Sequence, residues 1–241
     1  MRELGRMYQN LLQDYARAAF WWRQAGVGEG DDHAGVHLAE CYWKLGNKPM
    51  ALAQLEKTPP TFSMIKLWAD MGETQKALQM ADANAHGEYG DIACIYAGDA
   101  CRVAGQHAKA LQYYKQVLTI PASGQAKKRI ERNQQRARAN IEAIQLFDTL
   151  DIARVPDGTY RDASLGYEAP VEVEVVVKAG RIESVRVTNH REKQFYAALS
   201  DTPAKIIAKQ GVQGIDATSS ATITSEAIIN ATAKALAKGM K

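Results

Sequence analysis

The sequence predicts two domains, an all-α solenoid of helical repeats followed by a small α+β domain. Three patterns predict this arrangement: a glycine and alanine pattern that recurs in the N-terminal half, a polar helical stretch after it, and an alternating strand segment that precedes an alanine-rich helix. The chain of 241 residues is long enough for two cores of ordinary size. We place the repeats at residues 1–121, a linking or capping helix at 122–150 and the α+β domain at 151–241.

The repeats are marked by a glycine that is followed five residues later by alanine and then by leucine. This pattern recurs at Gly46–Leu52, Gly72–Leu78 and Gly105–Leu111. Glycine suits the end of one helix and alanine lets a second helix pack closely, so each copy predicts a pair of helices. With a less regular copy around Trp22, we expect three to four pairs. The spacing resembles the tetratricopeptide repeat, although the middle copy is short.

Two roles are open for the repeats. A stack of helix pairs presents a concave surface that commonly binds another protein, but it can also act as a packing support for the C-terminal domain. Four tryptophans fall in this part of the chain, and their helical spacing favours core positions over an aromatic groove: Trp21, Trp22, Trp43 and Trp68.

A long polar helix is predicted from Ser123 to about Leu150. Its basic residues suit either a solvated face or docking on phosphates or an anionic membrane surface, and blocks of charge favour the solvated face. The formal net charge of +3 is too small to imply a polyanionic partner, so we expect no nucleic-acid binding. The basic residues are Lys127, Lys128, Arg129, Arg132, Arg136 and Arg138.

A β-hairpin is predicted in the C-terminal domain. Residues 171–177 read VEVEVVV, whose alternation indicates a strand with one buried face, and Ile182, Val185 and Val187 mark a second strand. Gly180 lies in the short connection, where it can adopt positive φ without steric cost. A helix is expected from about Gln194 to Gln210, and Pro203 leaves open whether its interior is continuous.

A serine and threonine-rich loop, DATSSATIT at residues 216–224, precedes the last helix. Thr224 suits the N-cap and Glu226 the first turn, so the helix is expected to begin just after Thr222. The start of a helix favours bound anions. The same residues also fit an ordinary loop that caps a helix without any ligand.

This loop resembles the attachment motif of the FMN-binding domain family, found in subunits of bacterial respiratory complexes. The motif reads Asp, two free positions, Ser or Thr, Gly, Ala, then Ser or Thr. Its slots are filled here by Asp216, Ser219, Ser220, Ala221 and Thr222, with Ser220 in place of Gly. The resemblance implies that Thr222 carries FMN as a phosphoester made by a FAD:protein FMN transferase. No base is evident beside Thr222, which fits modification by a separate enzyme.

The resemblance extends upstream. Residues 157–160 read DGTY, like the family's opening, and Gly166 and Tyr167 match its following glycine and aromatic residue. His190 and Glu192 fall in a segment that lies near the flavin in the family, although Lys193 leaves its signature incomplete. The resemblance therefore implies further flavin contacts by Thr224, Gly158, Tyr160, His190 and Glu192, while His190 also fits an exposed histidine at a strand end.

The function implied by the resemblance is electron carriage by covalently bound FMN, with the repeats docking a redox partner protein. The alternatives are an interaction scaffold that binds FMN loosely or not at all, and a flavin-dependent enzyme for a small substrate that no residue specifies. The family works outside the cytoplasm, so we expect an extracytoplasmic protein that meets the membrane only indirectly, as part of a complex; a cytoplasmic location is the alternative. The sequence contains no complete export signal and no long apolar run.

Other chemistries are not supported by the residue pattern. His33 and His37 lie one helical turn apart, but no set of carboxylates and cysteines completes a metal site, so no metal is expected. No Ser-His-Asp arrangement can be assembled around His190. Cys41, Cys94 and Cys101 all fall in the repeats, where their odd number favours buried thiols over disulfides.

Overall fold

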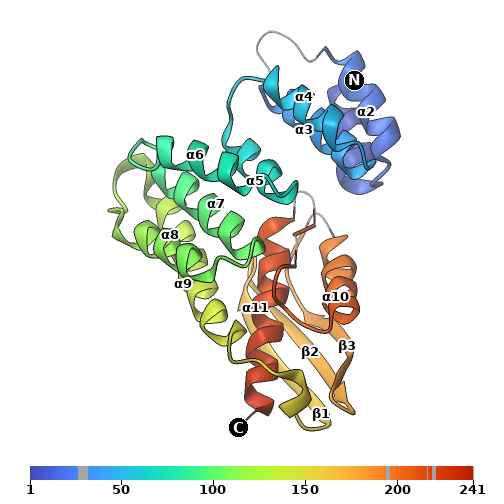
Figure 1. Ribbon diagram of the computed structural model, residues 1–241, viewed down its shortest axis with the longest axis vertical. Helices are drawn as coiled ribbons and strands as arrows, with labels where there is room; N and C mark the ends of the chain where they lie inside the picture. The colour runs from blue at the N-terminus through green and yellow to red at the C-terminus, as the bar shows by residue number, and fades with distance from the viewer. Residues whose placement is uncertain (27–31, 194–195, 216, 219–220, 241) are drawn as a thin grey trace. The chain divides into compact units, whose positions relative to one another are not determined.

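The computed structural model describes residues 1–26, 32–193, 196–215, 217–218 and 221–240. The chain forms two compact units, Met1–Ala100 and Cys101–Lys241, which are described separately (Figure 1). The boundary between them lies inside helix α7, Gly90–Val103. The domain limits expected at residues 121 and 150 remain a prediction.

The first unit is built from helices. Short connections join them, and Asn47 caps one helix by accepting a hydrogen bond from the Met50 N–H. The elements are α1 (Arg2–Arg6), a π-helical turn (Met7–Leu11), α2 (Tyr15–Gln24), α3 (Asp32–Lys44), α4 (Lys48–Glu56), α5 (Phe62–Asp70), α6 (Thr74–Asn84) and the start of α7.

The predicted glycine turns between paired helices are confirmed. Gly46 joins α3 to α4, Gly72 joins α5 to α6 and Gly105 joins α7 to α8 (His107–Thr119), with φ values of 81°, 79° and 71°. These angles lie in the left-handed region, where glycine has no steric penalty. The alanines of the pattern, Ala51, Ala77 and Ala110, are fully buried. The tetratricopeptide assignment of these helix pairs stays a prediction.

Aromatic side chains and thiols contribute to the core, although Trp21 and Trp43, for which core positions were also expected, are only half-buried. Trp22 and Trp68 are buried, and Trp22 donates a hydrogen bond from Nε1 to Gln9 Oε1 at 2.8 Å. The three cysteines are buried and lie outside any disulfide. Burial, with the nearby carboxylates of Asp82 and Asp91, raises the pKa of Cys94 to about 11. The prediction of buried thiols is confirmed.

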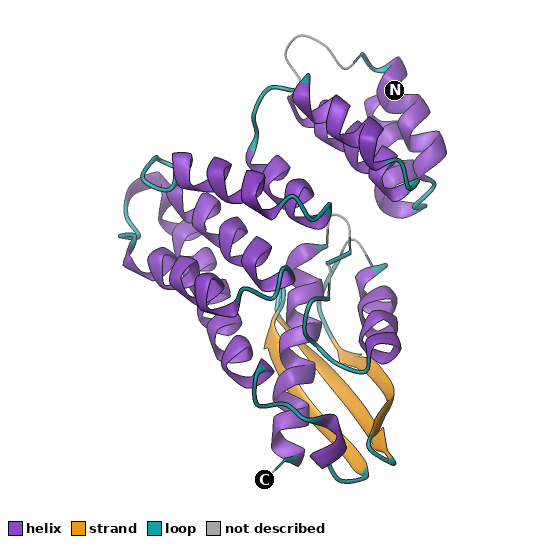
Figure 2. Ribbon diagram, viewed as in Figure 1, coloured by secondary structure: helices purple, strands orange, loops and turns teal. Residues whose placement is uncertain are grey.

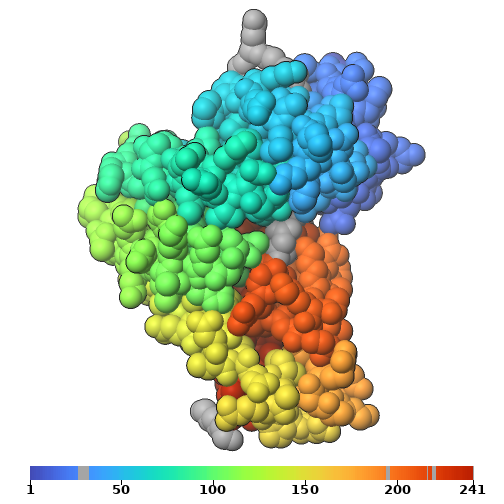
Figure 3. All heavy atoms as spheres, viewed as in Figure 1, coloured from blue at the N-terminus to red at the C-terminus, as the bar shows by residue number. Residues whose placement is uncertain are grey.

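The second unit is an antiparallel sheet of order β1-β2-β3, with α10 and α11 packed against one face (Figures 1 and 2). In Figure 3, α11 is visible only in small patches, consistent with its many buried residues. The elements after α8 are a 3-10 turn (Gly124–Ala126), α9 (Lys127–Phe147), a second 3-10 turn (Ile152–Arg154), β1 (Gly158–Leu165), β2 (Pro170–Lys178), β3 (Arg181–Asn189), α10 (Ala198–Lys209) and α11 (Thr222–Gly239).

The predicted hairpin is formed by β2 and β3. The turn consists of Ala179 and Gly180, with φ of 48° and 70°, as in the two-residue turns that suit antiparallel strands. The alternate residues Val171, Val173, Val175 and Val177 are buried, which gives the sheet its covered face.

The opposite face of the sheet carries a charged cluster. Glu174 of β2 pairs with Arg161 of β1 and Arg186 of β3. Hydrogen bonds from Arg186 and Arg161 lower the pKa of the Glu174 carboxyl. The register places Arg161 and Arg186 directly opposite Glu174 on the two neighbouring strands. Such cross-strand pairs stabilise a sheet.

Three expectations about the second unit need correction. Strand β1 was not predicted, because its centre reads RDAS and lacks apolar alternation. Helix α10 begins at Ala198 and continues through Pro203 to Lys209.

The polar helix expected from Ser123 is a 3-10 turn followed by α9. Its basic residues are not all in contact with solvent, because Arg136 is 5% exposed. Helix α9 packs against α8, α11 and β1.

Candidate functional site

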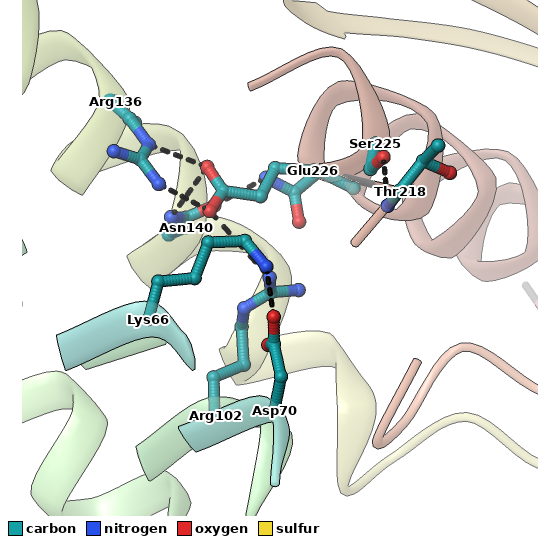
Figure 4. Close-up of polar contacts among 9 residues, drawn as sticks. Lys66, Asp70, Arg102, Arg136, Asn140, Thr218, Ser225 and Glu226 are labelled. Atoms are coloured by element: carbon teal, nitrogen blue, oxygen red, sulfur yellow. Dashed lines mark hydrogen bonds and ion pairs between the residues drawn. The ribbon is translucent and has the colours of Figure 1, made fainter. Parts of the chain in front are cut away.

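The candidate site surrounds the first turn of α11. Thr222 is the first residue of this helix, and its side chain is half-buried. The loop before it is tied to the helix, because the Thr218 N–H donates to Ser225 Oγ at 3.0 Å (Figure 4). The Ala221 N–H also donates to the Thr218 carbonyl at 3.0 Å. Thr222 is therefore held at a fixed helix start while keeping access to solvent.

The rest of the predicted attachment motif is only partly described. Asp216, Ser219 and Ser220 lie outside the described residues. Ala221 is buried and forms the N-cap of α11. The expectation that Thr224 caps the helix is wrong: Thr224 lies inside the first turn, where its buried hydroxyl donates to Glu192 Oε2 at 2.6 Å.

Glu192 joins three segments around the start of α11. This residue lies just after β3 and is 6% exposed. Its Oε1 atom accepts hydrogen bonds from the backbone N–H groups of Tyr167 at 2.9 Å and Glu168 at 3.3 Å. The other oxygen accepts from Thr224. A buried carboxylate needs such donors to offset lost hydration. Glu192 therefore fixes the β1–β2 connection against the helix start.

Gly166 allows the β1–β2 connection to lie directly against the Glu192 carboxylate. A Cβ atom at this position would lie 2.4 Å from the Ala169 carbonyl oxygen and 2.7 Å from Glu192 Oε1. Both distances are too short for a real carbon atom, and the first contact is with backbone that cannot swing away. The glycine of the predicted Gly-Tyr pair is therefore required by packing around Glu192.

His190 lies just after β3 and differs from the exposed histidine considered from the sequence. Its side chain is half-buried, and its ring centroid lies 6.3 Å from that of Tyr196. The Nδ1 atom is buried and has no hydrogen-bond partner among the residues that the structure describes. Thr218 Oγ1 is also buried and has no hydrogen-bond partner among these residues. Buried polar atoms without partners are uncommon in proteins and invite an explanation.

Gly158 and Tyr160 are not brought to Thr222. A Cβ atom on Gly239 would lie 2.7 Å from the Tyr160 ring, so Tyr160 packs at the C-terminal end of α11. At 1.5 Å per residue, the ends of this helix are about 25 Å apart. The Tyr160 hydroxyl donates to the Pro156 carbonyl at 2.8 Å, and Gly158 lies beside this ring.

A pocket of about 190 Å³ opens beside the helix start. One of its walls is Arg132 of α9, whose guanidinium carbon lies 3.8 Å from the centroid of the Tyr167 ring and whose Nη2 donates to the Tyr167 carbonyl at 2.8 Å. Such stacking holds the charged group in place. The pocket is lined by Arg132, Gln135, Arg136, Leu165, Gly166, Tyr167, Glu168 and Ile223.

A buried charged network lies behind the pocket. Glu226 of α11 is 2% exposed and accepts hydrogen bonds from Arg136 Nε and Nη2, each at 2.6 Å (Figure 4). Arg102 Nη2 lies 3.7 Å from Glu226 Oε1, and Asn140 Nδ2 donates to Oε2 at 3.4 Å. Sequence patterns did not predict this network, because its members are far apart in the chain. A glutamate on the apolar side of the alanine-rich helix was the one available signal.

Two features are absent from the described part of the chain. No group of three or more His, Cys, Asp and Glu side chains there is arranged to hold a metal ion. Within the same residues, every helix is too short or too polar to cross a membrane.

Comparison with known proteins assigns a cofactor to this region. Residues 166–237 match the family model described as the FMN-binding domain, and this match supports FMN as the cofactor and a flavoprotein function. A protein of Treponema pallidum (strain Nichols), described as uncharacterized, is 37% identical over 86 residues, which are 35% of this chain and 24% of that protein. The match thus spans about a quarter of that relative. No solved structure matches the chain.

Proposed function

We propose that this chain is an electron carrier whose FMN-binding domain holds FMN as a phosphoester on Thr222. The observation that carries the proposal is the position of Thr222: a half-buried hydroxyl at the first residue of a long helix, next to the pocket residue Ile223 and inside the segment that matches the FMN-binding domain. Bound FMN would supply reversible electron uptake at its isoalloxazine ring.

The residues around Thr222 suit a phosphate and a flavin. The first N–H groups of α11 and the positive end of its dipole favour an anion at this end of the helix. Thr218 Oγ1, in the loop before Thr222, and His190 Nδ1, just after β3, are buried polar atoms without partners among the described residues, and we propose that the bound group supplies those partners. The pocket beside the helix start offers cationic, aromatic and apolar side chains.

The protein's own part in this function is to hold and orient the cofactor. Glu192 keeps the first turn of α11 fixed to the β1–β2 connection through Thr224 and two backbone N–H groups. Ser225 and Thr218 close the loop that precedes Thr222. A rigid helix start of this kind limits the motion of an attached group, which is what preorganised sites require.

The proposal includes partners and a location. A FAD:protein FMN transferase would modify Thr222, since a threonine hydroxyl is a weak nucleophile and none of the described contacts supplies a base. The helix pairs of the first unit, which we propose to be tetratricopeptide-like, would dock a redox partner protein. We propose an extracytoplasmic location, as in the flavinylated members of the family that the sequence resembles.

Intact mass spectrometry tests the attachment. After co-expression with a matching transferase, the chain should gain the mass of FMN less one water. Thr222→Ala should abolish the gain, whereas Thr188→Ala, at an exposed position on β3, should keep it. A chain that stays unmodified with an active transferase, or a Thr222→Ala chain that is still modified, would contradict covalent attachment at Thr222.

A scaffold that binds FMN without a covalent bond is the second candidate. Ser220 supports it, because it stands where the attachment motif has glycine and serine adopts fewer backbone conformations. This candidate predicts an unchanged mass together with saturable binding of free FMN, measured by quenching of flavin fluorescence.

A further inference from the structure

We propose that helix α9 supplies one wall of the flavin site, with Arg132 as the cation that faces the pyrimidine edge of the isoalloxazine ring. The inference rests on the proposed function and extends it to a helix outside the matched residues 166–237. Four observations carry it: the pocket, the charge of Arg132, the stack on Tyr167 and the place of Ile223.

The pocket lies where a flavin attached to Thr222 would reach. Ile223, the residue after the attachment threonine, is part of its lining. Its volume of about 190 Å³ is smaller than the roughly 300–1,000 Å³ typical of sites that enclose a whole small molecule. The pocket therefore accepts one end of the cofactor, while the phosphate stays at the helix start.

Arg132 is the pocket cation that keeps its charge available. The charge of Arg136 is matched by Glu226, and Glu168 lies 3.8 Å from Lys193. In the described part of the chain, no carboxylate pairs with Arg132, whose contacts are the ring and carbonyl of Tyr167. These contacts orient the guanidinium without neutralising it, so Arg132 brings an unpaired positive charge to the wall of the pocket.

The chemistry of the lining matches the pyrimidine edge of a flavin. That edge has carbonyl oxygens that accept hydrogen bonds, and negative charge gathers there when the ring is reduced. Arg132 and Gln135 are donors, while Leu165 and Ile223 provide apolar contacts for a flat ring. A fixed cation beside developing negative charge stabilises the reduced form and raises the reduction potential.

The reduction potential of the flavinylated chain tests the inference. Arg132→Gln removes the charge and should shift the potential to a more negative value in spectroelectrochemical titration, while Arg132→Lys should restore part of the shift. Arg138→Gln removes an exposed charge from the same helix and should keep the wild-type potential. Equal potentials for Arg132→Gln and Arg138→Gln would overturn the inference, although the mass of each chain would still report attachment.

A second measurement decides the inference if the chain is not flavinylated, an outcome that would end the covalent proposal. Free riboflavin, which lacks the phosphate, is titrated into the unmodified chain and its fluorescence followed. Loss of the charged hydrogen bond in Arg132→Gln should weaken binding about tenfold or more. Absence of riboflavin binding, equal affinity of the two chains, or an effect seen with FMN alone would overturn the inference.

Discussion

Arg136 of α9 and Glu226 of α11 form a bidentate ion pair, in which both hydrogen bonds are 2.6 Å long. The two residues are 90 positions apart in the sequence. Both side chains are almost fully buried. The pair fixes the helix that begins at Thr222 to the helix that provides the pocket wall. Because planar guanidinium and carboxylate groups meet in one geometry, the pair also fixes the rotation of α11 about its axis.

Glu226→Gln is expected to destabilise the chain strongly. It leaves the buried guanidinium groups of Arg102 and Arg136 without this carboxylate, and breaking a buried pair typically costs about 3–5 kcal/mol. The free energy of unfolding in urea measures the loss. Glu131→Gln, an exposed change on α9, should stay within about 0.5 kcal/mol of wild type. A loss of similar size in both variants would contradict a special role for Glu226.

Thr224→Val is expected to cost about 1–3 kcal/mol, because it removes a donor from the buried Glu192 carboxylate while keeping the shape of the side chain. The fraction of the chain that the transferase modifies should also fall, since the start of α11 loses its tie to the segment after β3. Thr159→Val, at an exposed position on β1, is the matched control. Urea unfolding and intact mass provide the two measurements, and unchanged stability in Thr224→Val would refute the role assigned to Glu192.

Ala179→Asn is expected to stabilise the hairpin by about 0.5–1 kcal/mol, because Ala179 has φ of 48° and asparagine tolerates this region better than alanine. The backbone hydrogen bond from the Ala179 N–H to Asp157 Oδ1 is retained by the substitution. Ala179→Val should have the opposite effect, since a β-branched residue is strained at positive φ. Thermal unfolding followed by circular dichroism would rank the three chains, and the reverse order would show that the turn is not strained.

Glu174→Gln is expected to destabilise the chain at neutral pH and to matter less in acid. The pKa of this carboxyl is lowered by Arg186 and Arg161, so its stabilising effect is present above the ordinary value of 4.5 and is lost as the pH falls through the lower folded-state value. Unfolding free energies of the two chains should therefore differ most near pH 7 and converge below pH 4.5. Glu183→Gln, at an exposed position on β3, should show no such convergence.

Local patterns were sufficient to predict the hairpin and the helix turns. The alternation at residues 171–177 indicates a strand with one buried face. Gly180 indicates a turn position with positive φ. The existence of α11 was also predicted, with a start just after Thr222, because the polar loop gives way to alanine and isoleucine at helical spacing; the helix begins at Thr222 itself.

Contacts between distant segments could not be predicted in the same way. The hydroxyl of Thr224 was expected to cap its own helix, but Glu192, 32 residues away, is its partner. Arg136 was expected in a solvated face, yet its partner Glu226 belongs to the last helix. In both cases the side chain pairs with a buried carboxylate that comes near only in the folded chain. The sequence of one helix therefore does not reveal the partner.

The packing of α9 has a practical consequence for dissecting the chain. A fragment that starts after the end of this helix would contain all of the matched segment, but it would lack one of the elements that pack on α11 and would leave Glu226 without Arg136. Sequence similarity alone thus marks out too short a piece for isolation. We therefore expect a self-sufficient flavin module to start upstream of Arg102, so that it keeps α8, α9 and both guanidinium groups that face Glu226.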